Sequence, residues 1–295
     1  FLMRALVVGA TGFVGSRLVE ALAEAGHEVV ACSRSATSHG FPEGVEPREA
    51  DFAEPSTLEG LCEDIDVAYY LLHSLSAADF VERDRRYAKR FRSQADAGDV
   101  DRVVYLSGIT SDETQSAHLD SRREVEGLLA AGGYDLTVLR AAIIIGAGSS
   151  SFRIIDDLTD RLPVMIVPEW VQTPCQPIYI DDAIRYLVGV LNVPATRGET
   201  YEIGGPTVHT YESMLRLLAA LKQKHIVLIP VPVMSPELSA HWLRMVTDVD
   251  YNMARPLIES MRYPVTVSAE ADIQSVINID RKSIGEAMAT ASGLR

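Results

Sequence analysis

The stretch that decides the fold is VVGATGFVG, residues 7–15. It follows the hydrophobic run RALVV, residues 4–8, and opens a helical pattern. Three glycines in this strand-to-helix context are typical of a dinucleotide site. Gly9 allows the tight turn, Gly12 lets the backbone approach a pyrophosphate, and Gly15 lets the helix pack against the strand. The alternative is a tight turn that binds no ligand, and the context favours binding.

The first half of the chain alternates short β-branched runs with helical patterns. Such alternation is typical of βαβ units and of a mostly parallel sheet. We therefore predict an α/β fold, a Rossmann-type doubly wound parallel sheet with a smaller C-terminal lobe. The predicted strands occupy residues 4–8, 27–33, 45–51, 66–72, 101–107 and 135–145, and the clearest predicted helices occupy residues 13–25 and 121–131.

The character of the chain changes after the last of these strands. Residues 163–177 include four prolines, which disfavour a regular central strand. A helical period returns over residues 179–192, with two acids in its first turn, where the helix dipole favours them. We expect a dinucleotide-binding core over residues 3–146 and a C-terminal substrate lobe over residues 147–295, in which residues 176–192 pack back on the core.

The chain of 295 residues is strongly acidic, with a formal charge of −14 from 41 acidic and 27 basic side chains. Such a field repels phosphate backbones and anionic lipid, so nucleic acid is not an expected partner. The bases are mostly arginines, and an acidic, lysine-poor surface suits a high-salt cytoplasm, although a GC-rich genome would give the same bias. No apolar run reaches the roughly 18 to 20 residues that a membrane helix needs, so no membrane span is expected.

The pattern of cysteines and histidines limits the kinds of chemistry that this chain could perform. Cys32, Cys62 and Cys175 are widely spaced and form no CxxC pattern, which predicts reduced thiols in a cytoplasmic protein. The seven histidines show no HxxxH or HxH spacing, so no metal site is expected. The stretches LSGIT and GAGSSS lack the G-x-S-x-G elbow of hydrolases.

The end of the second predicted strand selects the cofactor. NAD sites usually place Asp or Glu there to hold the ribose hydroxyls, whereas a basic residue accommodates a 2′-phosphate. This chain has Cys32, Ser33 and Arg34 at that point. We therefore predict NADP(H) in preference to NAD(H), with Arg34 facing the phosphate and Ser33 as a hydrogen-bond donor. The alternative is that Arg34 is one more solvated arginine.

Several stretches together resemble the atypical, NmrA-like branch of the short-chain dehydrogenase/reductase superfamily. They are GATGFVG, SR after the second strand, ADFAEPSTLEGL, YLLHS, RVVYLSGI and LTVLRAA. Two further stretches, RLPVMIVPEWVQTPCQPIYIDDAIRYLVG and YEIGGPTVHTYESML, resemble NAD(P)H-binding proteins described as YbjT-like. The resemblance covers nearly the whole chain.

The resemblance implies cofactor contacts at the carboxyl ends of the strands, where open α/β sheets bind ligands. It puts residues 51–52 beside the adenine, 72–74 along the adenosine and pyrophosphate, 107–108 below the nicotinamide and 141–143 at its carboxamide. The alternatives are simple loop caps and a core histidine. The full predicted set is Gly9, Thr11, Gly12, Phe13, Val14, Gly15, Ser33, Arg34, Asp51, Phe52, Leu72, His73, Ser74, Ser107, Gly108, Ala141, Ala142 and Ile143.

The stretch HLDSRREVEG, residues 118–127, lies where the superfamily keeps its Tyr-x-x-x-Lys pair. In that pair the lysine favours the phenolate and the tyrosine gives a proton to the substrate oxygen. Related proteins often carry a glutamate four residues beyond the lysine, and Glu126 fits that place. The resemblance then puts Arg122 at the lysine position and His118 at the tyrosine position. Arginine cannot relay a proton, and its charge favours the neutral imidazole, so we interpret the two as a degenerate catalytic pair.

Two functional hypotheses follow. The first is an NADP(H)-dependent oxidoreductase that passes hydride to a small apolar acceptor, such as a quinone or an enone; a quinone suits the missing tyrosine because its reduced oxygens can take protons from water. The second is a non-catalytic NADP(H)-binding redox sensor, or an assembly or stabilising subunit of a larger complex with a protein partner. An open, apolar cleft beside Ser107, His118 and Ala142 would favour the first. Pocket candidates in the lobe, with core packing as the alternative, are Trp242, Met245 and Tyr251.

Overall fold

The computed structural model describes residues 2–75, 77–110, 116–231 and 251–294. Its centre is a seven-stranded sheet in the order β11-β6-β5-β4-β1-β2-β3, and every neighbouring pair in it is parallel. The strands are β1 (Arg4–Val8), β2 (Glu28–Ser33), β3 (Glu46–Glu49), β4 (Val67–Tyr70), β5 (Arg102–Gly108), β6 (Asp135–Ala141) and β11 (Thr200–Ile203).

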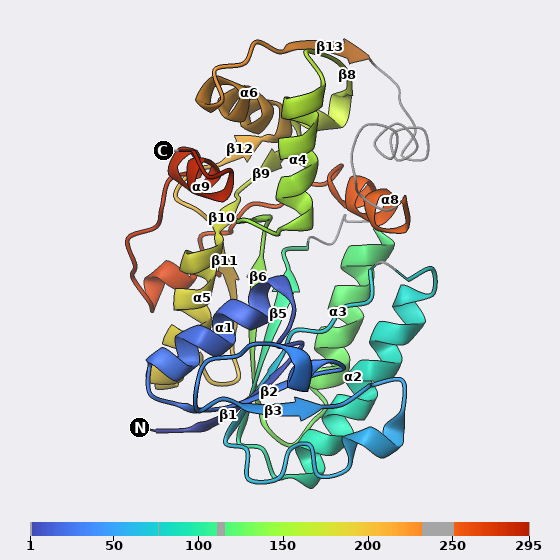
Figure 1. Ribbon diagram of the computed structural model, residues 1–295, viewed down its shortest axis with the longest axis vertical. Helices are drawn as coiled ribbons and strands as arrows, with labels where there is room; N and C mark the ends of the chain where they lie inside the picture. The colour runs from blue at the N-terminus through green and yellow to red at the C-terminus, as the bar shows by residue number, and fades with distance from the viewer. Residues whose placement is uncertain (1, 76, 111–115, 232–250, 295) are drawn as a thin grey trace.

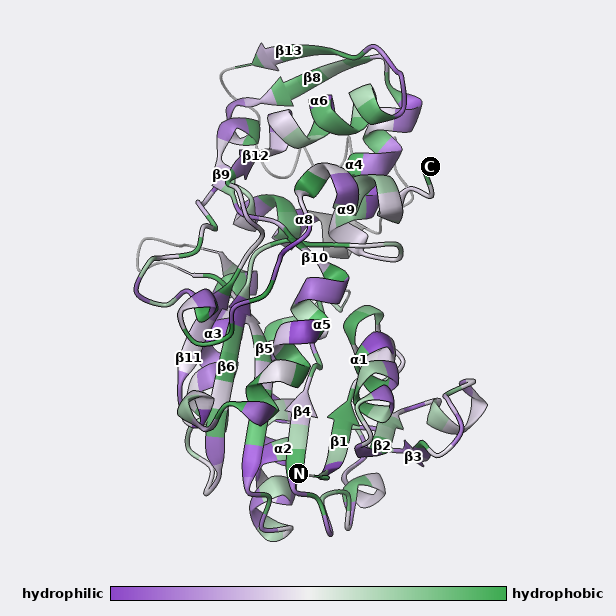
Figure 2. Ribbon diagram, turned by 90° about the vertical axis from the view of Figure 1, so that its left-hand side faces the viewer, coloured by the Kyte–Doolittle hydropathy of each residue, from purple (hydrophilic) through white to green (hydrophobic). Residues whose placement is uncertain are grey.

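The central strands send alternate side chains into two hydrophobic cores, one on each face of the sheet. In β1, Ala5 and Val7 belong to one core, and Leu6 and Val8 belong to the other. A strand that is buried on both faces needs an unbroken apolar run, which explains the composition of β1. Figure 2 shows β1 as hydrophobic, whereas the edge strand β3, with the sequence EPRE, is hydrophilic.

Helices cover both faces of this sheet (Figure 1). On one face α1 (Phe13–Glu24) packs against α5 (Ile180–Gly189), and on the other α2 (Phe80–Ala97) packs against α3 (Ala117–Leu129). The predicted Rossmann-type, doubly wound parallel sheet is therefore confirmed. Helix α5 comes from the segment that the sequence places against the core.

The strand order reverses between β1 and β4. Strands β2 and β3 lie on one side of β1, and β4, β5 and β6 lie on the other. In open α/β sheets the loops diverge at such a point, and ligands bind there at the carboxyl ends of the strands. The glycine turn after β1 and the loop after β4 meet at this position, and both contribute to the cavity described below.

The remaining elements gather beyond the carboxyl ends of the strands (Figure 1). Small two-stranded sheets join β8 with β13, β9 with β12, and β7 with β10. No helix among the described residues is long and apolar enough to cross a membrane. These elements are β7 (Ile144–Ile145), α4 (Ser150–Arg161), β8 (Val164–Pro168), β9 (Pro174–Cys175), β10 (Ile178–Tyr179), β12 (His209–Thr210), α6 (Tyr211–Leu221), β13 (Val227–Val231), α8 (Tyr251–Ser260) and α9 (Ile284–Ala291).

Two features differ from the sequence predictions, and one agrees with them. Helix α3 begins at Ala117 rather than near Ser121, with Asp120 in the first turn, where the helix dipole favours an acid. As the four prolines predict, residues 163–177 add no strand to the central sheet, and their short strands β8 and β9 belong to two-stranded sheets, in which prolines are tolerated. Strand β11 lies beyond the predicted core boundary at residue 146, yet it completes the central sheet beside β6.

Candidate functional site

The turn between β1 and α1 depends on its glycines. Gly9 has a φ of +91°, which side-chain-bearing residues rarely adopt. A Cβ at Gly15 would lie 2.1 Å from the carbonyl oxygen of Gly9, so only glycine lets α1 begin this close to β1. Gly12 is the N-cap of α1, and no side chain caps the helix. The N–H groups of its first turn are therefore available to an anion.

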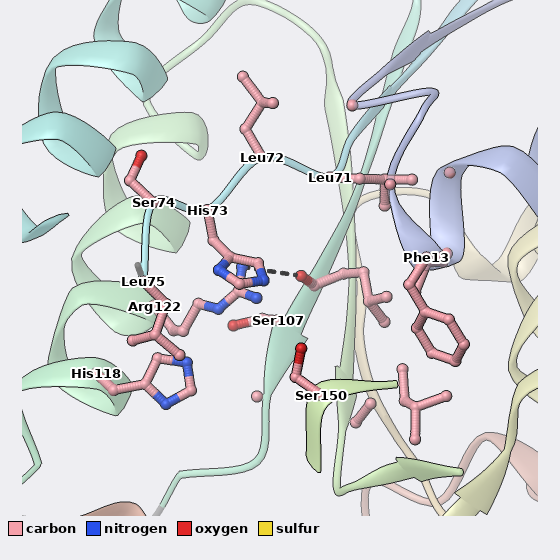
Figure 3. Close-up of a pocket in the computed structure, with 18 of the residues that line it drawn as sticks. Phe13, Leu71, Leu72, His73, Ser74, Leu75, Ser107, His118, Arg122 and Ser150 are labelled. Atoms are coloured by element: carbon pink, nitrogen blue, oxygen red, sulfur yellow. Dashed lines mark hydrogen bonds between the residues drawn. The ribbon is translucent and has the colours of Figure 1, made fainter. Parts of the chain in front are cut away.

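A cavity of about 660 Å³ extends from this turn across the carboxyl ends of the strands. Its volume lies within the usual range of small-molecule sites. Every cofactor and catalytic residue that the sequence predicts lies in its wall, although these residues come from widely separated stretches of the chain. Figure 3 shows part of that wall, with residues of the β4 loop, β5 and α3 around the same space. The wall contains Gly9, Thr11, Gly12, Phe13, Val14, Gly15, Ser33, Arg34, Asp51, Phe52, Leu72, His73, Ser74, Ser107, Gly108, His118, Arg122, Ala141, Ala142 and Ile143.

At the end of the cavity nearest β2, the polar groups are only partly engaged. The Ser33 hydroxyl accepts a hydrogen bond from the backbone N–H of Ser35 at 3.2 Å. Arg34 is exposed and forms no ion pair with any residue that the structure describes. The Asp51 carboxylate accepts from the backbone N–H of Ala53 at 2.8 Å, so it caps its own loop while it lines the cavity. The guanidinium of Arg34 thus remains available to an anionic ligand.

Two residues of α2 at the same end were missed by the sequence analysis. Arg83 and Tyr87 both line the cavity. The Tyr87 ring lies 6.0 Å from the ring of Phe52, measured between centroids, and Arg90 donates to the Phe52 carbonyl oxygen. Arg83 and Tyr87 are four residues apart and so share one face of the helix. This spacing alone does not identify a binding site, because the two side chains reach the cavity only through the packing of α2 beside the loop after β3.

His118 and Arg122 lie four residues apart on α3 and come together at the cavity wall (Figure 3). The Arg122 guanidinium also reaches toward the strand beneath it, donating to the hydroxyl of Tyr105 at 3.2 Å and to the carbonyl oxygen of Leu106 at 3.5 Å. Tyr105 comes from β5 and was not identified from the sequence. The arginine at the predicted lysine position therefore has a tyrosine partner, contributed by a different element.

The two histidines of this region are neutral at pH 7. Burial lowers the pKa of His118 to about 3, and the positive charge of Arg122 adds to the effect. Desolvation at the cavity wall also lowers the pKa of His73, although this side chain is exposed to the cavity, and Arg122 and His118 nearby add to the effect. A neutral imidazole is a weak acid, so His118 is a poor proton donor at this pH.

The charge of the cavity wall contrasts with that of the whole chain. The described wall includes three arginines, Arg34, Arg83 and Arg122, and a single carboxylate, that of Asp51. The chain as a whole has a formal charge of −14. A cationic cleft in an acidic protein attracts ligands that carry phosphate groups. Together with the open first turn of α1, these residues fit a phosphate-bearing dinucleotide.

The far end of the cavity is formed by α4, α6 and α8. Its apolar side chains include Ile154, Leu257 and Met261, and Tyr211 and Ser260 add hydroxyl groups. No motif identifies these residues in the sequence, because they come from separate segments that meet only in the folded chain. Of the pocket candidates proposed from the sequence, Trp242 and Met245 lie outside the described residues, as does the side chain of Tyr251.

Metal and thiol chemistry find no support in the part of the chain that the structure describes. There, no group of His, Cys, Asp or Glu side chains is arranged to hold a metal ion. Cys32, Cys62 and Cys175 are buried and unpaired, and burial raises the pKa of each thiol to about 12. Thiols with such pKa values are poor nucleophiles at neutral pH.

Known proteins with related sequences bear on this site. The model of the NAD(P)H-binding family matches residues 9–161, which is more than half of the chain. Subunit 9 of the mitochondrial NADH dehydrogenase [ubiquinone] 1 alpha subcomplex of Dictyostelium discoideum is 23% identical over 225 residues. That alignment covers 72% of this chain and 62% of the relative, so the chain spans less than two thirds of that relative's length.

Solved structures share the fold over nearly the whole chain. Triphenylmethane reductase of Citrobacter sp. matches with a TM-score of 0.80 and 15% identity, over 99% of this chain and all of that one. A nucleoside-diphosphate-sugar epimerase of Staphylococcus aureus matches with a TM-score of 0.78 and 15% identity, over 97% and 99% of the two chains. The predicted resemblance to the atypical short-chain dehydrogenase/reductases is confirmed. The chain belongs to the NAD(P)H-binding family.

Proposed function

We propose that the chain binds NADP(H) and passes hydride to a small apolar acceptor, such as a quinone or an enone. The observation that carries this proposal is the continuity of the cavity. One end has the glycine turn and Arg34, and the other has apolar side chains such as Leu257 and Met261. Hydride transfer requires that cofactor and acceptor meet in one space, held in a reactive orientation.

In this proposal each part of the cofactor has a partner in the wall. The first-turn N–H groups of α1 would hold the pyrophosphate, and Arg34 would hold the 2′-phosphate. Ser107 and Gly108 would lie below the nicotinamide, with residues 141–143 at its carboxamide. When bound, the nicotinamide supplies the hydride, while the chain positions the acceptor and excludes water. The preference for NADP(H) over NAD(H) rests on the Arg34 guanidinium.

The acceptor class follows from the surroundings of the reaction end. The neutral imidazole of His118 is a weak proton donor, which favours an acceptor whose reduced oxygens take protons from water, as those of a quinone do. The described wall residues from α4, α6 and α8 carry no charged side chain, which suits a neutral, apolar molecule. In this assignment His118 shapes the wall, and Arg122 holds a positive charge behind it.

A non-catalytic role is the second candidate. Two relatives, from Dictyostelium discoideum and Arabidopsis thaliana, are subunits of mitochondrial NADH dehydrogenase, and both are 23% identical to this chain. The chain also has histidine and arginine at the positions of the superfamily's tyrosine and lysine. An NADP(H)-binding subunit that stabilises or assembles a larger complex, or senses its redox state, would need no acceptor and no proton donor. We also propose a cytoplasmic location, on the basis of the reduced cysteines.

Binding and turnover distinguish the two roles. The first experiment titrates the purified protein with NADPH, NADP⁺ and NADH, at low and at molar salt. The second measures oxidation of saturating NADPH by menadione, a quinone, and by cyclohexenone, an enone. Turnover of either acceptor supports the reductase, whereas tight binding without turnover supports the non-catalytic subunit. A strong preference between NADPH and NADP⁺ would point to the redox sensor. The absence of binding at both salt concentrations would remove the reductase, the assembly or stabilising subunit and the redox sensor alike.

A further inference from the structure

A buried phenol lies directly behind the reaction end of the cavity. Tyr105 of β5 is fully buried, and its hydroxyl accepts a hydrogen bond from Arg122 at 3.2 Å. The proposed hydride transfer gives this group no role. A second buried tyrosine, Tyr70 of β4, lies beside it with a ring-centroid distance of 5.9 Å. The Tyr70 hydroxyl has no hydrogen-bond partner among the described residues.

Ser107 connects the phenol to the cavity. It follows Tyr105 by two residues on the same strand, so both side chains project from the same face of the sheet. Ser107 lines the cavity, yet its buried hydroxyl has no hydrogen-bond partner within the described structure. Buried hydroxyl groups without partners are rare and often have a ligand or a chemical role to explain them. Burial raises the pKa of the Tyr105 phenol, and the charge of Arg122 and the Ser107 hydroxyl both oppose that rise.

The groups around the phenol are suited to holding a transient negative charge. Arg122 stays protonated at any relevant pH, and its guanidinium faces the phenol oxygen directly. The other titratable groups that act on Tyr105 and Tyr70 are Glu126 on α3 and Asp84 and Tyr87 on α2. Glu126 is engaged by Arg140 at 2.6 Å, and Asp84 accepts from the backbone N–H of Ser74 at 2.8 Å. Arg122 is therefore the group that would stabilise a phenolate here.

We propose that Tyr105, acting through Ser107, supplies the proton that a reduced enone oxygen needs, an inference that rests on the proposed reductase function. Hydride adds to the β-carbon of the enone, NADPH is oxidised to NADP⁺, and the electron pair of the C=C bond moves to give an enolate. The Ser107 O–H bond breaks as its proton passes to the enolate oxygen, and the Tyr105 O–H bond breaks to restore Ser107. Tyr105 is left as a phenolate beside Arg122, and it regains a proton from water through Ser107 when the product has left.

The relay predicts a difference between two acceptors of one enzyme. A quinone forms a hydroquinone anion that water can protonate, whereas an enone forms a strongly basic enolate that benefits from a positioned acid. General acid catalysis typically contributes 10²–10⁴-fold. We expect Tyr105→Phe and Ser107→Ala each to slow single-turnover reduction of cyclohexenone on the order of 10²-fold at pH 7. In Tyr105→Phe, which changes no residue of the cavity wall, reduction of menadione and the Kd of NADPH should stay within about 2-fold, and the enone rate should recover as the pH is lowered and solvent supplies the proton.

Tyr70→Phe is the matched control, because it removes a neighbouring buried hydroxyl that has no described partner. It should leave both acceptor rates unchanged. Equal losses with both acceptors in Tyr105→Phe would overturn the relay, and so would a Tyr105→Phe enone rate that equals the rate of Tyr70→Phe. A wild-type chain that reduces menadione and not cyclohexenone would also overturn it. A wild-type chain that reduces neither would instead remove the proposed function.

A second readout needs no cofactor. Tyrosine labelled with carbon-13 at Cζ reports phenol ionisation by NMR in the unliganded protein. If the Ser107 hydroxyl contacts the phenol, Ser107→Ala should shift the Cζ signal of Tyr105 and raise its pKa further, while the signal of Tyr70 stays in place. An unchanged Tyr105 signal would show that the link between the phenol and the cavity is missing, and the relay would fail whatever the acceptor rates.

Discussion

At the scale of single residues, Arg34 carries the expected choice between NADPH and NADH. Its exposed guanidinium forms no ion pair with a described residue. A hydrogen bond to a charged group contributes about 1.5–3 kcal/mol, so Arg34→Ala should weaken NADPH binding by roughly 10- to 100-fold and leave NADH within about 2-fold. Isothermal titration with both cofactors measures the difference. Arg216→Ala, at an exposed arginine of α6 outside the cavity wall, should change neither, and equal losses for the two cofactors in Arg34→Ala would contradict the assignment.

Another residue, His118, makes the folded state sensitive to acid. Its pKa falls from the usual 6.5 to about 3 on folding. Below pH 6.5 the unfolded chain therefore binds more protons than the folded chain. The free energy of unfolding that the neutral His118 contributes is fully present above pH 6.5 and is lost as the pH falls toward 3. Between pH 6.5 and 5 one such group accounts for up to about 2 kcal/mol of the unfolding free energy. Urea unfolding at both pH values should show a smaller loss for His118→Gln than for the wild type, and identical losses would show that this histidine does not titrate as described.

At the scale of elements, the contact between β1 and α1 controls the geometry of the phosphate site. A Cβ at Gly15 would overlap the Gly9 carbonyl, so Gly15→Ala should push the helix away from the strand. We expect a loss of about 1–3 kcal/mol of stability from overpacking and a loss of NADPH affinity of about 10-fold or more, because the first-turn N–H groups move. Urea unfolding and an NADPH titration measure the two effects.

Gly127→Ala is the matched control for that change. Gly127 lies within α3, and a Cβ there would meet nothing within 4 Å. Alanine at a helical position without a steric conflict should stabilise the chain by about 0.5–1 kcal/mol and leave the cofactor affinity unchanged. If Gly15→Ala bound NADPH as the wild type does, the glycine turn would not be the pyrophosphate site.

At the scale of the whole molecule, Arg102 ties the central sheet to the segment after α5, at the end of β5 opposite the cavity. Its buried guanidinium donates to the Val190 carbonyl oxygen at 2.8 Å and to the hydroxyls of Thr137 and Thr196 at 2.8 and 2.7 Å. Arg102→Met should lower the unfolding free energy by about 2–3 kcal/mol, because these acceptors lose a charged donor. Chemical denaturation measures this loss. The Kd of NADPH should not change, and a parallel loss of affinity would show that the two ends of the sheet are coupled.

Net charge also acts on the molecule as a whole. With a formal charge of −14 the folded chain repels itself, and salt screens that repulsion. Raising KCl from about 0.05 M to about 1 M should raise the melting temperature, while NADPH affinity should fall because the same ions screen the arginines of the cavity. Thermal unfolding and titration over a salt series measure the opposite trends. A melting temperature that falls with salt would contradict self-repulsion as a term in stability.

The nucleotide-binding half could be predicted well because its signals are local. The glycine turn, the apolar strands and the polar end of β2 each lie within about ten residues, so periodicity and backbone requirements reveal them. Other features depend on distant segments. The sequence does not show that β11 pairs with β6, nor that Arg83 and Tyr87 line the same end of the cavity as Arg34.

The sequence by itself determined the parallel sheet, the helix that opens at Gly12, and the pair Ser33 and Arg34 at the end of β2. These depend on conformational preferences and side-chain periods within a short stretch of chain. Only the tertiary structure decided that Arg122 faces Tyr105 and that α8 closes the far end of the cavity. Such contacts join residues far apart in the chain, and they depend on how helices pack against the sheet, which no local pattern encodes.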